Sequence, residues 1–191
     1  MITKNNSIIK FIAAGLIVLG FSLHTVAQNS DFGTIQAKAE VLTGIDVTAV
    51  SDLNFGFVSP GVNKIVGLDG VALPASSNQT NVTVGQFTVE AGEGASVNLN
   101  FTEIPTEITH TNGTDKLDIV DASYNAVWNS TATPVGGTTI ATPTTIGTGT
   151  NIASFPVGGI IYIYLGGECA PTSGQLAGVY ADNVVLTATY N

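Results

Sequence analysis

The sequence predicts an all-β protein, arranged as a two-sheet, immunoglobulin-like β-sandwich with Greek-key connections. The composition favours sheet over helix, because Thr, Val, Gly, Ala and Ile are abundant whereas Lys, Arg, Glu and Leu are scarce. Short stretches of alternating apolar and polar residues follow one another at intervals of about 8 to 12 residues, with turn-forming residues between them. No window combines an apolar period of about 3.6 residues with helix-capping residues at its ends.

Residues 1–27 have the features of a secretory signal peptide. Two lysines supply a positive region, residues 11–21 are almost entirely apolar, and Ala27 ends a Thr-Val-Ala tripeptide that fits a cleavage site. A membrane anchor is the alternative, but the apolar stretch is short for a span of about 20 residues. We therefore expect export to the periplasm, cell surface or extracellular space, with residues 28–191 forming one domain.

The charge of the predicted mature chain argues against two kinds of partner. The chain would retain three lysines (Lys38, Lys64 and Lys116), no arginine and all fourteen acidic residues. Nucleic acids and anionic membrane surfaces are recognised by clustered Lys and Arg, which this chain lacks. We accordingly expect no nucleic-acid partner, and no membrane span once the signal peptide has been removed.

The alternating pattern places the strands along the chain. Apolar residues at every second position predict a first strand at residues 35–41 and a second at residues 45–49. Asp69-Gly70, between two short apolar runs in residues 64–73, predicts a hairpin turn. The alternation changes phase at Gly85, where we expect a β-bulge. Further strands are expected at residues 95–101, 117–119, 124–128 and 152–165.

The second half of the chain contains the strand with the strongest core signal. Residues 160–165 are apolar on both faces, which is typical of a central strand. A Thr-, Gly- and Pro-rich tract at residues 129–151 precedes it and is interpreted as a long exposed loop or ragged hairpin. A second loop, with Glu168 and Cys169, is expected at residues 166–174. Because Cys169 is the only cysteine, no intramolecular disulfide can form, and we expect a buried thiol.

The last fourteen residues, Gly178 to Asn191, contain the predicted closing strand. Its residues alternate between two faces, one of Val184, Leu186, Ala188 and Tyr190 and the other of Val185, Thr187 and Thr189. The first face needs a core, whereas the second tolerates water. A terminal strand is often an edge strand, whose unpaired N–H and C=O groups are a template for another chain.

This ending resembles the C-terminus of chaperone–usher pilin subunits, which has a penultimate aromatic residue and a glycine fourteen residues from the end. Tyr190 and Gly178 occupy those places here. The chain also resembles a family of small secreted bacterial domains of unknown function, which looks like spore coat protein U and pilin-type subunits. The motifs that carry this second resemblance are Leu53-x-Phe55-Gly56, Phe87-x-Val89, Val157-Gly158-Gly159, and Gly178-x-Tyr180 with Tyr190-Asn191.

The resemblance implies a pilin-like sandwich with a structural or surface role, and it supplies no catalytic residues. We expect a pilin-like or coat-like subunit that assembles through β-strand addition at its C-terminal strand. Its expected partners are a periplasmic chaperone, copies of itself or other surface subunits. The candidate partner-binding residues are Gly178, Val184, Leu186, Thr187, Ala188 and Tyr190.

Three points qualify this expectation. Many pilin subunits carry an internal disulfide, which a single cysteine excludes. Residues 35–41 can donate a strand only if they are not the first strand of their own domain. The closing strand of any β-sandwich would show the same alternation, so the alternative function is a self-contained secreted module that binds carbohydrate or protein.

No enzymatic activity is expected. His110, the only histidine of the predicted mature chain, lies in a polar, turn-like stretch, where we expect a solvated loop. Neither a Gly-x-Ser-x-Gly elbow nor a phosphate-binding loop is present. Glycoside hydrolysis needs two carboxylates at a suitable separation, and fourteen acidic residues can supply such a pair by chance, so this activity is kept as an alternative. One region offers oxygen ligands suited to calcium, at Asn112, Asp115, Asp118 and Asp121. Residues three apart on a strand face opposite ways, so we expect a solvated surface there, with no metal and no cofactor.

Overall fold

The computed structural model describes residues 33–39, 41, 43–140 and 149–191. The chain divides into two units, Met1–Glu40 and Val41–Asn191. The predicted signal peptide, residues 1–27, lies outside the described residues. In the part of the chain that is described, no helix is long and apolar enough to cross a membrane.

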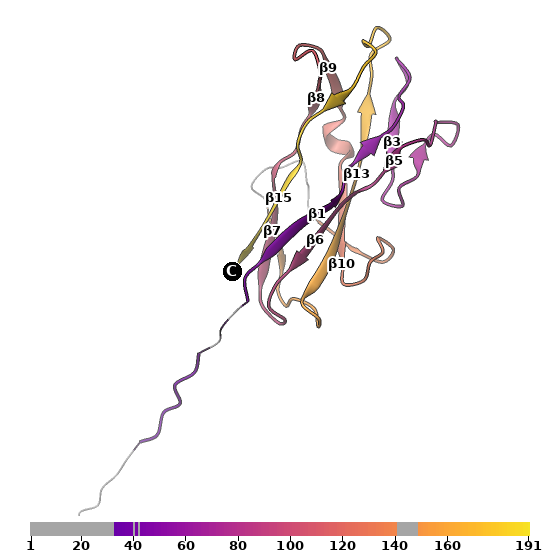
Figure 1. Ribbon diagram of the computed structural model, residues 1–191. Helices are drawn as coiled ribbons and strands as arrows, with labels where there is room; N and C mark the ends of the chain where they lie inside the picture. The colour runs from indigo at the N-terminus through magenta and orange to yellow at the C-terminus, as the bar shows by residue number, and fades with distance from the viewer. Residues whose placement is uncertain (1–32, 40, 42, 141–148) are drawn as a thin grey trace, which may run out of the picture. The chain divides into compact units, whose positions relative to one another are not determined.

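The second unit is all-β, as the sequence predicted (Figure 1). Its elements are β1 (Asp46–Ser51), β2 (Asn54–Phe55), β3 (Lys64–Val66), β4 (Ala72–Leu73), β5 (Val82–Thr83), β6 (Gly85–Glu90), β7 (Val97–Glu103), β8 (Glu107–His110), β9 (Lys116–Ile119), the 3-10 turn η1 (Asp121–Ser123), β10 (Asn125–Asn129), β11 (Thr138–Thr139), β12 (Thr150–Ile152), β13 (Ile160–Ala170), β14 (Tyr180–Ala181) and β15 (Val185–Tyr190). Every strand pair is antiparallel.

Two sheets face each other across the core, and in the described residues β2 and β5 form a third, two-stranded sheet. The larger sheet is centred on β13, which pairs with β6 and β3 along one side and with β10 and β9 along the other. The smaller sheet has the order β12-β7-β15. Phe87 of β6 meets Phe101 of β7 edge to face, with ring centroids 6.4 Å apart, so the sheets pack against each other through apolar side chains. The arrangement is sandwich-like, and the Greek-key, immunoglobulin-like topology stays a prediction.

The central-strand prediction is confirmed, whereas the loop predicted at residues 166–174 is wrong for residues 166–170 and right for residues 171–174. Strand β13 continues to Ala170 and therefore includes Gly166, Gly167 and Cys169. A side chain at Gly166 would place its Cβ 2.5 Å from the carbonyl oxygen of Val66. The glycines permit close approach of a neighbouring strand, whereas from sequence alone they resemble turn residues.

The strand predicted at residues 35–41 is absent from the described part of that segment, residues 33–39 and 41. Ile35 is 94% exposed and Val41 is 93% exposed. Alternation fixes which side chains could share a face, but a strand also needs a neighbour that pairs with its backbone. The segment has the pattern of a strand without a pairing partner.

The bulge predicted at Gly85 is also wrong. The chain changes partners there: β5 pairs with β2, whereas β6 pairs with β1 and β13. The change of phase in the sequence therefore marks a switch between sheets. An irregularity in register occurs instead on β1, between Ala49 and Ser51.

Two further regions bear on the sequence predictions. The hairpin turn at Asp69-Gly70 is confirmed, since β3 pairs with β4 and Gly70 has a φ of 75°. The tract at residues 129–151 is partly ordered into the sheet, because β11 pairs with β10 and Ile140 is buried. Residues 141–148 lie outside the described residues.

Candidate functional site

The candidate site lies along β15, the last strand. Within the described chain, β15 pairs with β7 alone, which leaves its other side without a strand partner. Leu186 is buried, and Val184, Ala188 and Tyr190 are partly buried against the core. The sequence therefore identified the inward face of this strand correctly.

The direction of each backbone N–H of β15 follows from its register with β7. The N–H of Asn191 donates to the carbonyl of Ser96 at 3.1 Å. Because hydrogen-bonded and non-hydrogen-bonded pairs alternate in an antiparallel ladder, Thr187 opposite Asn100 is again a hydrogen-bonded position. The N–H of Ala188 then points away from β7, toward the open side. Thr187 is further tied to β7 by its hydroxyl, which donates to the Asn100 carbonyl at 3.1 Å.

A second open edge lies beside the first. Strand β1 contacts β15 but pairs with β6 only. The N–H of Ala91 donates to the Gly159 carbonyl, so every second N–H of β6, including that of Val89, points toward β13. Val89 is therefore at a non-hydrogen-bonded position of the β1–β6 ladder. Its partner there, Val47, accordingly has an N–H that points away from β6. Tyr190 holds the two edges together at one end, since its hydroxyl accepts from Gly92 N–H at 2.9 Å and donates to the Thr43 carbonyl at 2.7 Å.

Apolar side chains between these edges are incompletely covered. On the inward face of β6, Gly85 and Val89 are buried, yet Phe87 between them is only half-buried. The residue opposite Phe87 on β1 is Ala49, which is small and exposed. On the β15 side, Val184 and Ala188 are also only partly buried. We call this surface the β1–β15 seam, formed by Val47, Ala49, Phe87, Val184 and Ala188.

Gly178, a predicted partner-binding residue, lies against His110 of its own chain. Its φ is 154°, and a Cβ at this position would lie 1.9 Å from His110 Nε2. The His110 ring packs edge to face on Tyr180, with centroids 4.8 Å apart. Strand β14 pairs with β8 at this contact. Gly178 therefore has a packing role that the sequence did not reveal.

The prediction that His110 lies in a solvated loop is wrong. His110 ends strand β8 and is partly buried. Its Nδ1 accepts a hydrogen bond from the Asn112 N–H at 3.1 Å. Its Nε2 is buried and has no hydrogen-bond partner among the described residues. The contacts of the His110 side chain with Asn112, Tyr180 and Gly178 are those of a packed side chain.

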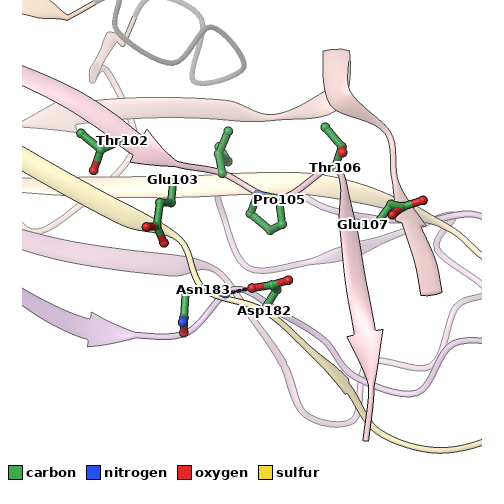
Figure 2. A pocket seen from close by; sticks show the side chains of 8 residues that line it. Thr102, Glu103, Pro105, Thr106, Glu107, Asp182 and Asn183 are labelled. Carbon is green, nitrogen blue, oxygen red and sulfur yellow. Dashed lines mark hydrogen bonds between the residues drawn. The ribbon is translucent and has the colours of Figure 1, made fainter. Parts of the chain in front are cut away.

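Carboxylates gather at the pocket shown in Figure 2, which has a volume of about 360 Å³. Glu103 ends β7, Glu107 begins β8 and Asp182 precedes β15. All three side chains are exposed, and Figure 2 shows them spread along the pocket. Asp182 accepts a hydrogen bond from the Asn183 N–H at 2.8 Å, which fixes one carboxylate locally.

The suggested calcium ligands serve a turn. Asn112 Oδ1 accepts from the N–H groups of Thr114 and Asp115, and its amide donates to Asp115 Oδ2 at 2.6 Å. Asp118 lies on β9 and Asp121 begins η1. Over the described ranges, no group of three or more His, Cys, Asp or Glu side chains is placed to hold a metal ion.

Cys169 is fully buried in β13, as expected. Burial raises the pKa of its thiol to about 11, and the sulfur donates to the Lys64 carbonyl at 3.6 Å. These features are typical of an unreactive structural thiol.

The chain matches no model of a known protein family, and no curated protein matches it. The motifs that carry the resemblances nevertheless have definite places in the fold. Phe55 is buried, Phe87 lies in the seam, and Gly56 and Gly178 both have positive φ.

Proposed function

We propose that this protein is an exported pilin-like or coat-like structural subunit that assembles by β-strand addition along the open side of β15. The observation that carries the proposal is the β1–β15 seam, where two unpaired strand edges flank incompletely covered apolar side chains. An edge of this kind is a template for a further strand. The resemblance to pilin C-termini supports the same location.

An added strand would pair with the free backbone groups of the seam and would cover its apolar side chains. Its backbone would bond to the outward N–H and C=O groups of Leu186, Ala188 and Tyr190. Its alternate side chains would cover Phe87 and Ala188, removing apolar surface from water. Backbone pairing would supply affinity, and the spacing of the apolar side chains would supply register.

Residues 35–41 of a second copy are the proposed donor. Ile35, Ala37, Ala39 and Val41 alternate with polar residues, and the described part of the segment forms no strand of its own domain. This observation supports donation by the segment, which the sequence made conditional on residues 35–41 not being the first strand of their own domain. A periplasmic chaperone is proposed to cover the same edge before assembly, because an uncovered edge promotes indiscriminate pairing.

Two proline substitutions on neighbouring residues test the proposal. Ala188→Pro removes an N–H that points to the open side, so the domain should fold while assembly is lost. Thr187→Pro is the matched control, because it removes an N–H directed at β7 and should destabilise the domain itself. Folding is measured by circular dichroism and thermal melting, and assembly by light scattering and electron microscopy.

The proposal fails if Ala188→Pro folds and still assembles normally. Deleting residues 35–41 separates donor from acceptor: the shortened chain should not form homopolymers but should still accept the strand of an intact copy. A protein that stays monomeric with or without these changes would instead be a self-contained binding module.

A further inference from the structure

A second pocket lies between the loop after β2 and the loop after β4. It has a volume of about 300 Å³, and its lining includes Phe57, Val62, Lys64, Ser77 and Asn78. It shares no residue with the β1–β15 seam. This size is within the range of sites for small molecules.

The Leu53-x-Phe55-Gly56 motif lies directly before Phe57, the first residue of one pocket wall. Phe55 pairs with Val82, joining β2 to β5, and Asn54 Oδ1 accepts from the Gly56 N–H at 2.7 Å. Gly56 has a φ of 62°, and a Cβ there would lie 2.3 Å from the Thr80 carbonyl oxygen. Glycine therefore brings the two walls together and sets the position of Phe57.

The Lys64 side chain is hydrogen-bonded to both walls of the pocket. Its side chain is only 3% exposed, although lysine is rarely buried. Its Nζ donates to the carbonyl of Phe57 on one wall, at 2.9 Å, and to the carbonyl of Asn78 on the other. Because Lys64 and both acceptor residues line the pocket, we infer that the ammonium group lies at its floor.

The hydrogen bonds of Lys64 use only two of the three N–H donors of its ammonium group. An ammonium group has three donors, and its recorded acceptors among the described residues are two neutral carbonyls. One donor and a full positive charge remain to be compensated in a desolvated place. Desolvation by burial also lowers the pKa of Lys64, which indicates that its charge is incompletely compensated. The Glu168 carboxylate, on the neighbouring strand β13, accepts from the Asn63 side chain at 2.7 Å.

We propose that this pocket binds a small molecule through a carboxylate group, which pairs with the third N–H of Lys64. A carboxylate supplies both the acceptor and the negative charge that the ammonium lacks. The hydroxyl of Ser77 at the wall provides a further donor. At the rim, Phe57 is 64% exposed and Val62 is 50% exposed, so the rest of the ligand is expected to have an apolar face.

Fluorine NMR with a matched pair of probes tests this assignment on the purified protein. The probes are 4-fluorobenzoate and its neutral isostere 4-fluorobenzamide, at equal ionic strength. The protein should broaden the benzoate signal and leave the benzamide signal nearly unchanged. Lys64→Met should weaken benzoate binding about tenfold or more, since a charged hydrogen bond is lost. The exposed Lys116, replaced in Lys116→Met, is the control and should bind like the wild type.

A second pair of variants applies even if Lys64→Met does not fold. Ser77→Asp places a carboxylate in the pocket, where it should pair with Lys64 and exclude benzoate, whereas Ser77→Asn should leave binding nearly intact. The proposal is overturned if the wild type binds both probes equally or binds neither. It is also overturned if folded Ser77→Asp binds benzoate as well as Ser77→Asn does.

Discussion

Gly178→Ala tests whether the glycine of the C-terminal motif supports the fold or a partner. The added Cβ would lie 1.9 Å from Nε2, 2.7 Å from Cδ2 and 3.0 Å from Cε1 of His110. The ring cannot move freely, because Nδ1 accepts from Asn112 and one face packs on Tyr180. Moving the ring to relieve the clash therefore costs both that hydrogen bond and that ring contact, and the alternative is a shift of strand β14.

The expected loss of stability has two parts. A non-glycine residue at a φ of 154° costs about 1–3 kcal/mol. Displacing the ring adds about 0.5–1.5 kcal/mol for the hydrogen bond and about 0.5–1.5 kcal/mol for the aromatic contact. The sum is about 2–6 kcal/mol, a large fraction of a total stability of about 5–15 kcal/mol.

Urea denaturation of the wild type and four variants (Gly178→Ala, Gly174→Ala, His110→Ala and the double variant His110→Ala/Gly178→Ala) separates the two parts. Gly174→Ala is the control, because nothing lies within 4 Å of the added Cβ and the φ of Gly174 is not positive. It should change stability by no more than about 0.5 kcal/mol. In a His110→Ala background, Gly178→Ala should cost only the backbone part.

The reasoning is refuted if Gly178→Ala and Gly174→Ala are equally stable. If Gly178→Ala remained as stable as the wild type but failed to assemble, the glycine would serve a partner, as the resemblance to pilins implies.

Two further predictions concern Tyr190 and Cys169. Tyr190→Phe removes the hydrogen bonds of its hydroxyl to Gly92 and Thr43 and should cost about 1–3 kcal/mol in urea denaturation; an unchanged midpoint would contradict the bridging role of this hydroxyl. Burial raises the pKa of the Cys169 thiol from 9.0 to about 11, so the unfolded chain binds fewer protons in this range and stability should fall as pH rises through it. Relative to Cys169→Ala, in which this titration is absent, the wild type should lose about 2–3 kcal/mol between pH 8 and 11. Burial lowers the pKa of Lys64, which acts in the opposite direction in both proteins; a difference that stayed constant with pH would contradict the assignment.

The parts of the fold that the sequence predicted are those in which side-chain pattern and burial coincide. Residues 160–165 were predicted as a central strand because they are apolar on both faces, and β13 is the strand around which the larger sheet is built. The wrong predictions concern which backbone segments lie next to each other, which the side-chain pattern does not encode. Residues 35–41 have the alternation of a strand, yet their described part, residues 35–39 and 41, forms none. Gly166 and Gly167 resemble turn residues although they allow close packing.

The β1–β15 seam was partly predictable from the sequence, whereas the Lys64 pocket was not. Leu186 and Tyr190 were identified from sequence, since inward-facing side chains follow the alternation. The pocket at Lys64 could not be predicted, because a lone lysine in a β-hairpin is normally a solvated residue. Its burial depends on contacts with Phe57 and Asn78 that no sequence pattern records. Only the positive-φ glycine of the Leu53-x-Phe55-Gly56 motif indicates a close approach of chain segments there.

The open edge of β15 shows why a backbone site needs the register as well as the pattern. Along a strand, both the side chains and the N–H groups alternate with a period of two residues. The residues that fill the core can therefore be either those whose N–H points outward or those whose N–H is paired. The bond from Asn191 to Ser96 selects the first arrangement, so Ala188 contributes a side chain to the seam and an N–H to the open side. Thr187, on the opposite face, has its N–H directed at β7. Strand addition must therefore be tested at Ala188, and Thr187 measures only how firmly β15 is held by its own sheet.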